Sequence, residues 1–187
     1  MTSAPKTSSE RSDDLLFLGG EQLSKGLYDV LGLWSALDAL DFRGSLHWYG
    51  NIGEDFRRLI SRSAHADRIH LHGRQPRSQI FRQANASKVI LVLSRGEPFG
   101  MVTIEAMGMG CVPIAWDVAT GTKEVVPPGA GMFAPLGDYA GCARLVLAAC
   151  KDHASLSASL TAHARSKFSE SAMRKITEAG GQAKVIE

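Results

Sequence analysis

Short apolar runs recur along the chain, and polar or glycine-containing stretches separate them. Runs of this kind, rich in aliphatic and aromatic residues, predict β-strands. The expected strands are residues 14–20, 45–50, 68–72, 89–93 and 112–116, with a short edge strand at residues 131–135. The fourth run contains no polar residue, which is typical of a strand that is covered on both faces.

Between these runs the apolar residues follow helical spacing. In residues 26–40 they fall on one face, as expected of a helix packed on a core. They are Leu27, Val30, Leu31, Trp34, Leu37 and Leu40. The other expected helices are residues 54–64, 77–84, a short segment around Glu105, and residues 122–126, 138–152, 154–168 and 169–179, with Asp138 as an N-cap.

Strands that alternate with helices predict a single α/β domain with the Rossmann-like three-layer arrangement. Its sheet is expected to be largely parallel, with helices on both faces. We expect this domain to occupy residues 14–187. Residues 1–13 are rich in Ser, Thr, Pro and charge, and this composition predicts a disordered leader.

The overall composition excludes several classes of protein. A net charge of only +2 gives no electrostatic case for binding nucleic acid. The longest apolar runs are too short to span a membrane, and the polar N-terminus lacks the apolar core of a secretory signal. Cys111, Cys142 and Cys150 are odd in number and scattered, which favours a reducing compartment and hence the cytoplasm.

The candidate chemistry lies in residues 94–116, where a loop leaves the fourth strand and opens a helix. Open α/β sheets bind ligands at such points. The backbone N–H groups of Gly100, Met101 and Val102 would be unpaired at the start of this helix, so they favour an anion such as phosphate.

Two glutamates flank this helix start, Glu97 in the loop and Glu105 about one turn into the helix. A carboxylate cannot hold an anion, so we expect both to accept hydrogen bonds from hydroxyl groups. Such a spacing is common by chance, and either residue alone could be a solvated surface charge. Glu105, however, lies between apolar neighbours, where an unpaired surface charge is unexpected. A phosphate beside a polyol suggests a sugar nucleotide as the ligand.

These motifs give the chain a resemblance to a known family. It resembles the C-terminal, donor-binding half of a family 4 (group 1) retaining glycosyltransferase, an enzyme with two Rossmann-like domains in the GT-B architecture. The family's E-G-F-G loop and E-A-M-A-x-G helix are matched by residues 97–100 and 105–110. Its P-V-I-A-S-D-V-G-G-x-x-E-I-V segment and its later PPGD-like segment are matched by residues 112–126 and 134–138.

The resemblance implies a role for each matched position. Glu97 would accept hydrogen bonds from the donor sugar beside its anomeric centre, and Glu105 would bind the ribose. The backbone N–H groups of Phe99, Gly100 and Met101 would contact the sugar and the distal phosphate. The family needs no metal and no cofactor for this chemistry.

In the family's first loop, G-R-x-x-x-x-K-G, an arginine and a lysine neutralise the diphosphate. Lys25 matches the lysine, but Gly20 occupies the place of the arginine. Its loss removes a bidentate phosphate clamp, which puts donor affinity and activity in doubt. Arg95 either compensates or lies on the surface; the sequence favours neither.

Two further features leave their alternatives open. Gly73 and Arg74 match the position at which the family contacts the nucleobase, but an ordinary glycine at a strand end explains them equally well. His70 and His72 alternate on one strand, but two ligands without a third are usually ordinary strand residues, so we predict no metal site.

The resemblance implies the donor-binding half of a retaining hexosyltransferase, an enzyme of polysaccharide biosynthesis that moves a sugar from a nucleotide-diphosphate sugar to an acceptor hydroxyl. The acceptor, a sugar or lipid-linked saccharide, would be held by an N-terminal domain absent from this sequence. We therefore expect the isolated chain to be weakly active or inactive. Peripheral attachment to the inner membrane face is compatible with the complete enzyme.

Two other functions remain open. The first is a catalytically inactive nucleotide-sugar-binding or regulatory module of the same fold, which Gly20 favours and the intact pair of glutamates opposes. The second is a sugar-nucleotide epimerase, which the E-P-F-G and E-A-M segments fit less well. The sequence does not indicate the nucleobase, the sugar or the acceptor.

Overall fold

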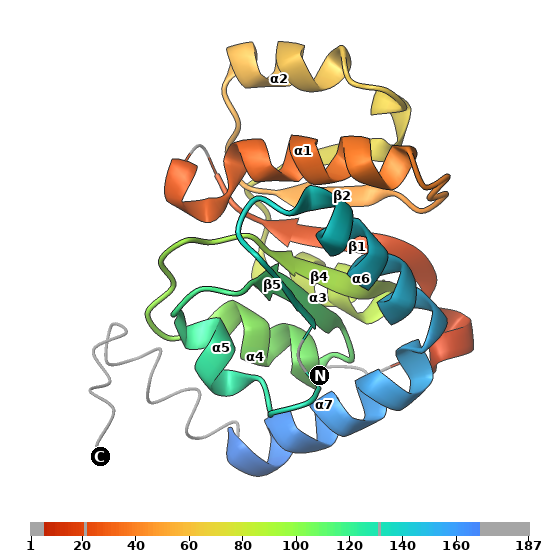
Figure 1. Ribbon diagram of the computed structural model, residues 1–187, viewed down its shortest axis with the longest axis vertical. Helices are drawn as coiled ribbons and strands as arrows, with labels where there is room; N and C mark the ends of the chain where they lie inside the picture. The colour runs from red at the N-terminus through yellow and green to blue at the C-terminus, as the bar shows by residue number, and fades with distance from the viewer. Residues whose placement is uncertain (1–5, 21, 131, 169–187) are drawn as a thin grey trace.

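A six-stranded parallel sheet forms the centre of the molecule, with its strands in the order β3-β2-β1-β4-β5-β6 (Figure 1). The computed structural model describes residues 6–20, 22–130 and 132–168. The strands are β1 Ser12–Leu18, β2 Leu46–Tyr49, β3 Ile69–Gly73, β4 Ser87–Val92, β5 Val112–Trp116 and β6 Met132–Ala134.

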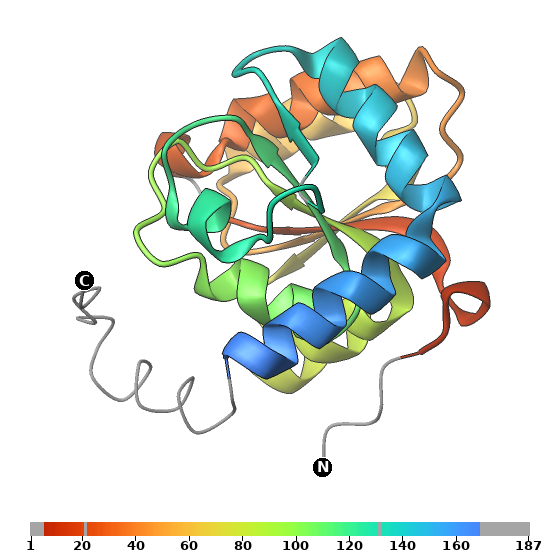
Figure 2. The ribbon, with the colours of Figure 1, turned by 60° about the horizontal axis from the view of Figure 1, so that its bottom comes forward.

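Helices cover both faces of this sheet, with α1 and α6 on one side and α3, α4 and α7 on the other (Figure 2). The helices are α1 Leu27–Asp38, α2 Glu54–Ser61, α3 Arg77–Ala86, α4 Met101–Gly108, α5 Gly121–Val125, α6 Tyr139–Lys151 and α7 His153–Lys167. Short 3-10 helices are η1 Ser8–Glu10, η2 Leu23–Lys25 and η3 Ala66–Arg68. The Rossmann-like three-layer domain with a parallel sheet is therefore confirmed.

Strand alternation divides the core between the two faces. Leu15 and Phe17 of β1 pack with the α1 side, whereas Leu16 between them packs with the α3 side. All three are buried because β1 is a central strand with a neighbour on each edge. This explains why the central strands read as unbroken apolar runs in the sequence.

Most predicted elements are present with small shifts of their ends. The stripe predicted on α1 is buried at four positions and partly buried at Leu31, whereas Leu40 is exposed because the helix stops at Asp38. Leu33, outside the predicted stripe, is fully buried because α1 contacts both the sheet and α6. Asp138 is the N-cap of α6, as predicted, and accepts a hydrogen bond from the Gly141 N–H at 2.8 Å.

Residues 6–13 differ from the predicted disordered leader, because they belong to the fold. Arg11 is buried and donates hydrogen bonds to the carbonyl oxygens of Ala84 and Ser87 at 2.9 and 2.8 Å, and to that of Met109. Ser8 pairs with the buried His153. The polar side chains that suggested disorder instead satisfy buried groups where α3 and α4 end.

The other predictions for the chain ends fall outside the part that the structure describes. These are residues 1–5 of the leader and the helix expected at residues 169–179. Gly131, at the start of the predicted edge strand, is also outside it, and the strand is observed as β6 Met132–Ala134. Among the described residues, no helix has the length and apolar character needed to cross a membrane.

Candidate functional site

The strand order places the candidate site between β1 and β4. From β1 the chain builds the sheet outwards to β3 and then returns to place β4 on the other side of β1. Loops that follow two such strands diverge and leave a crevice at the carboxyl ends, which is where open α/β sheets bind ligands. Lys25 follows β1 and Glu97 follows β4, so the topology brings both to this crevice.

Lys25 and Glu97 form an ion pair in this crevice. The Lys25 Nζ donates to Glu97 Oε2 at 2.5 Å, and the side chains are 31% and 17% exposed. They line a small recess together with Phe17, Ser94 and Val102. The structure therefore brings together the two residues predicted to be catalytic, with enough exposure for a ligand to reach them.

The two loops approach each other closely because a glycine follows Lys25. Gly26 has φ +83°, and a Cβ added there would lie 2.5 Å from the Leu93 carbonyl oxygen. Next to this contact, the Arg95 N–H donates to the Ser24 carbonyl oxygen at 2.9 Å. Only glycine fits this combination of a left-handed backbone and a close approach.

Gly100 likewise allows two backbone segments to approach closely, at the start of α4. It is the N-cap, with φ +61°, and no side chain caps the helix. A Cβ there would lie 2.8 Å from the backbone of Gly121, whose N–H donates to the Glu97 carbonyl oxygen at 2.5 Å. Met101 and Val102 follow in the first turn and are partly exposed, so the predicted anion-binding groups lie beside the Lys25–Glu97 pair.

Glu105, on the next turn of α4, forms an ion pair with Arg77, the first residue of α3. The glutamate side chain is 16% exposed and the arginine side chain 56%. Sequence reasoning identified Glu105 but not its partner. The signal that was available is the position of Arg77 at the start of the helix after β3, close to the expected nucleobase contacts.

The expected nucleobase contacts lie at the carboxyl end of β3. Gly73 has φ +66°, nothing lies within 4 Å of a Cβ added there, and its carbonyl oxygen accepts from the Gly50 N–H at 2.9 Å. Arg74 is exposed. Both residues therefore lie at the same edge of the sheet as Lys25 and Glu97, and the space beside Gly73 is open.

Gly20 lies in the loop after β1, where a Cβ would be 3.3 Å from the Asn51 carbonyl oxygen. This contact is tight but not prohibitive. Arg95 does not take the place of the missing arginine, because its Nη2 lies 3.0 and 3.1 Å from the two carboxylate oxygens of Asp29 on α1. Asp29 is buried and also accepts from the Tyr139 hydroxyl at 2.9 Å. Sequence reasoning missed this cluster.

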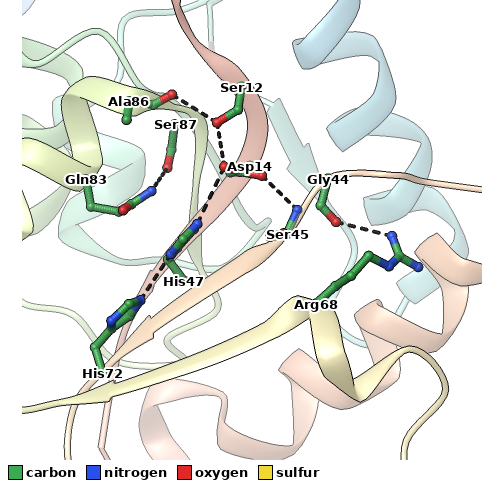
Figure 3. A network of polar contacts seen from close by, with 10 residues as sticks. All are labelled: Ser12, Asp14, Gly44, Ser45, His47, Arg68, His72, Gln83, Ala86 and Ser87. Carbon is green, nitrogen blue, oxygen red and sulfur yellow. Dashed lines mark hydrogen bonds and ion pairs between the residues drawn. The ribbon is translucent and has the colours of Figure 1, made fainter.

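A second polar network runs across β1, β2 and β3, outside the crevice (Figure 3). His47 Nε2 lies 3.5 Å from Asp14 Oδ2, and His47 Nδ1 lies 3.0 Å from His72 Nε2. Ser12 and the Ser45 N–H also donate to Asp14, at 2.5 and 2.8 Å. The sequence indicated the pair His70 and His72, but the parallel register is what adds His47.

This network shifts the proton affinities of its members. Burial alone would raise the pKa of Asp14, but the hydrogen bonds from His47, Ser12 and Ser45 outweigh it and lower the pKa to about 2. Burial and the neighbouring His47 and His70 lower the pKa of His72. Among the described residues, no group of three or more His, Cys, Asp or Glu side chains is arranged to hold a metal ion.

The three cysteines are packing residues, as expected from their apolar neighbours. Cys111, Cys142 and Cys150 are buried and unpaired in disulfides. Burial raises the pKa of each thiol to about 12, so none forms the thiolate that nucleophilic chemistry needs.

Comparison with known proteins gives a family, several relatives and many similar folds. The family model described as "Glycosyl transferases group 1" matches residues 12–152. A curated relative, the GDP-mannose:cellobiosyl-diphosphopolyprenol alpha-mannosyltransferase of Xanthomonas campestris, is 27% identical over 123 residues, which are 64% of this chain and 32% of that protein. The chain thus spans about a third of the length of this relative.

Two solved structures illustrate the similarity of fold. Staphylococcus aureus TarM, solved as a variant with UDP and saccharide ligands, superposes with a TM-score of 0.77 at 14% identity, over 97% of this chain and 37% of that one. The pneumococcal O-GlcNAc transferase GtfA, in complex with UDP and GlcNAc, gives a TM-score of 0.66 at 22% identity, over 94% and 37%. At these identities the similarity concerns the fold.

Proposed function

This chain belongs to the group 1 glycosyl transferases, and from that premise we propose that it is the nucleotide-sugar-binding half of a retaining hexosyltransferase. The reaction would move a sugar from a nucleotide-diphosphate donor to an acceptor hydroxyl and keep its anomeric configuration. The observation that carries this proposal is the Lys25–Glu97 pair at the crevice between β1 and β4, beside the uncapped start of α4. A cation, a carboxylate and an uncapped helix start placed side by side can bind a phosphate and a hydroxylated group together.

Lys25 and the start of α4 would bind the diphosphate. Without a ligand the ammonium pairs with Glu97 at 2.5 Å, and a diphosphate would compete for it with its larger negative charge. The helix N-terminus adds unpaired N–H groups and the positive end of the helix dipole. Because negative charge grows on the departing diphosphate during transfer, this preorganised positive field would stabilise the transition state.

Glu97 would orient the sugar. Once Lys25 turns to the phosphate, the Glu97 carboxylate regains lone pairs for the sugar hydroxyls. Its side chain is only 17% exposed, so these hydrogen bonds would form in a partly desolvated setting, where they are stronger than in water. The backbone N–H groups of Phe99, Gly100 and Met101 would complete the contacts to the sugar and its phosphate.

Glu105 would accept the ribose hydroxyls. A carboxylate has about four lone-pair sites, so Arg77 can keep one oxygen while a hydroxyl takes another. The guanidinium of Arg77 would thereby hold the carboxylate in one orientation. Gly73 and Arg74, at the end of β3, would frame the nucleobase in the open space beside Gly73.

The partners and location follow from the same proposal. Donor and acceptor would meet at the carboxyl edge of the sheet, and the acceptor, a sugar or lipid-linked saccharide, would be held by an N-terminal domain outside this chain. No metal or other cofactor is proposed. The unpaired cysteines suit the cytoplasm, with peripheral attachment to the inner membrane face for the complete enzyme.

One observation favours a second candidate, an inactive module that binds the nucleotide sugar and regulates. Gly20 stands where the family has its phosphate-binding arginine, and Arg95 is held by Asp29 instead of replacing it. Among the described residues that line the recess, Lys25 is then the one with a cationic side chain. Such a module would bind the donor but would not transfer its sugar, even in a complex with another protein.

Titration calorimetry with a panel of UDP-, GDP- and ADP-sugars tests the proposal. We expect one nucleotide class to bind, and Glu105→Ala to weaken that binding about tenfold or more, because hydrogen bonds to a charged carboxylate are lost. Glu54→Ala is the matched control, since Glu54 forms an exposed ion pair with Arg58 on α2. Absence of binding to any donor would contradict the proposal. Unchanged affinity in Glu105→Ala would remove the ribose assignment.

A further inference from the structure

Asp29 is a buried carboxylate that the proposed chemistry does not use. It lies in the first turn of α1, is 2% exposed, and receives three hydrogen bonds. Two come from Arg95 in the loop between β4 and α4, and the third comes from Tyr139 at the start of α6. Burying a carboxylate is costly unless such partners compensate, so a buried one at the edge of a site needs an explanation.

Asp29 and its partner Arg95 belong to the two segments that carry Lys25 and Glu97. Arg95 is two residues before Glu97, and Asp29 is one helical turn after Lys25. On the near side the Arg95 N–H donates to the Ser24 carbonyl oxygen at 2.9 Å. A backbone link from Ser24 and a side-chain link from Asp29 therefore both hold Arg95, two residues before Glu97, against the segment that contains Lys25.

Both ends of the side-chain link are well defined. The Asp29 carboxylate lies in the first turn of α1, near the positive end of the helix dipole, which favours a negative side chain at this position. Tyr139 donates one further hydrogen bond to this carboxylate, and the tyrosine ring packs on Trp116 at 5.8 Å between ring centroids. A Cβ added at Gly32 of α1 would lie 2.7 Å from that ring, so Tyr139 is in close contact with α1.

We infer that Asp29 is a positioning residue for the donor site: through Arg95 it holds the loop between β4 and α4 against α1, and so sets the distance between Lys25 and Glu97. The inference rests on the proposed function, because it assigns Asp29 to the same site. Arg95 is half-exposed and contributes little by itself as a surface ion pair. The ion pair matters because its partner, Asp29, is buried and rigid and therefore restricts where the loop can lie.

Three variants separate this role from a general contribution to stability. Asp29→Asn keeps the shape and removes the charge, and Arg95→Gln removes the guanidinium. Tyr139→Phe is the matched control, because it removes one hydrogen bond from the same carboxylate but leaves the link to the loop. All three are expected to fold with lowered thermal stability, which circular dichroism would verify.

The first measurement needs no ligand. In hydrogen exchange of the full chain, we expect the backbone amides of Gly96, Glu97, Phe99 and Gly100 to exchange about tenfold faster in Asp29→Asn and Arg95→Gln, and at the parent rate in Tyr139→Phe. Unchanged exchange in Asp29→Asn and Arg95→Gln would overturn the inference and leave Asp29 as a link between α1 and α6. Because no donor is added, this result is independent of the proposed function.

The second measurement is donor affinity, with the nucleotide sugar that the parent chain binds in calorimetry. We expect Asp29→Asn and Arg95→Gln each to weaken binding about tenfold, and the double variant to weaken it no further, since both act through one link. Tyr139→Phe is expected to bind as the parent does. Additive losses, or an equal loss in Tyr139→Phe, would overturn the inference. A parent chain that binds no donor would contradict the proposed function instead.

Discussion

At the scale of single residues, Gly100 is a position in the site that requires glycine. Its φ of +61° and the 2.8 Å approach of an added Cβ to Gly121 both exclude other residues. We expect Gly100→Ala to lower the free energy of unfolding by about 2 kcal/mol through strain and the displaced α5. Donor binding should fall with it, because the N–H groups at the start of α4 would move.

Urea unfolding and calorimetry of the same variant would measure both effects. Gly108→Ala, at the other end of α4, is the matched control, since nothing lies within 4 Å of a Cβ at that position. It is expected to leave stability unchanged or to raise it by up to about 1 kcal/mol, because alanine is the better helix former. A Gly100→Ala chain as stable as the parent would show that the loop has room to relax.

The sequence allowed prediction of some site residues and not of others, for a physical reason. Glu97, Glu105 and Lys25 belong to local motifs, so their types and spacing indicated a role before the fold was known. Arg77 and Asp29 act through partners on other helices, which depend on strand order and side-chain direction. No local pattern encodes such contacts; for Asp29, the available signal was an aspartate among the apolar residues of a predicted helix.

At the scale of elements, β1, β2 and β3 are linked by the network of Asp14, His47 and His72. Folding lowers the pKa of Asp14 to about 2 from its ordinary value of 3.8. A carboxyl group with a depressed pKa stabilises the fold above its unfolded pKa, and this contribution is lost as the pH falls through the folded value. The loss therefore occurs between about pH 4 and pH 2.

We expect Asp14→Asn to lower the free energy of unfolding at pH 7 by about 1 to 2 kcal/mol, because the carboxylate loses its hydrogen bonds from His47, Ser12 and Ser45. The difference from the parent should shrink as the pH falls from 4 towards 2, as urea unfolding over that range would measure. Asp55→Asn on α2 is the control, since its carboxylate is fully exposed. A difference independent of pH would contradict the ionic origin.

Element positions were predictable where the pattern was strong, and the segment before β1 was not. The unbroken apolar run of β4 and the apolar stripe of α1 correspond to observed elements. A strand that is covered on both faces needs apolar residues throughout, and a helix packed on a core needs them at helical spacing. Residues 6–13 resembled a disordered segment because they are polar. Arg11 shows why composition failed there: its guanidinium is buried against backbone carbonyl groups that a sequence pattern does not display.

At the scale of the whole molecule, the strand order determines which residues the domain brings together for binding. It gathers residues from the loops after β1, β3 and β4 at one edge of one sheet, and these residues suit a donor. The curated mannosyltransferase relative is about three times as long as the matched segment, so the proposed transfer needs more chain than this. Binding and turnover should therefore separate in the isolated chain.

This separation gives the last prediction. A donor present at 100 times its dissociation constant should stabilise the folded chain by about 2.7 kcal/mol, since it binds only the folded state. That gain should appear as a higher melting temperature in a thermal-shift assay, and Glu105→Ala, with about tenfold weaker binding, should lose about half of it. In the same samples, release of free nucleotide should stay near the uncatalysed background, because no residue of this chain is proposed to hold the acceptor. Robust sugar transfer by this chain alone would show that its own residues hold the acceptor, and the proposed division between two domains would be wrong.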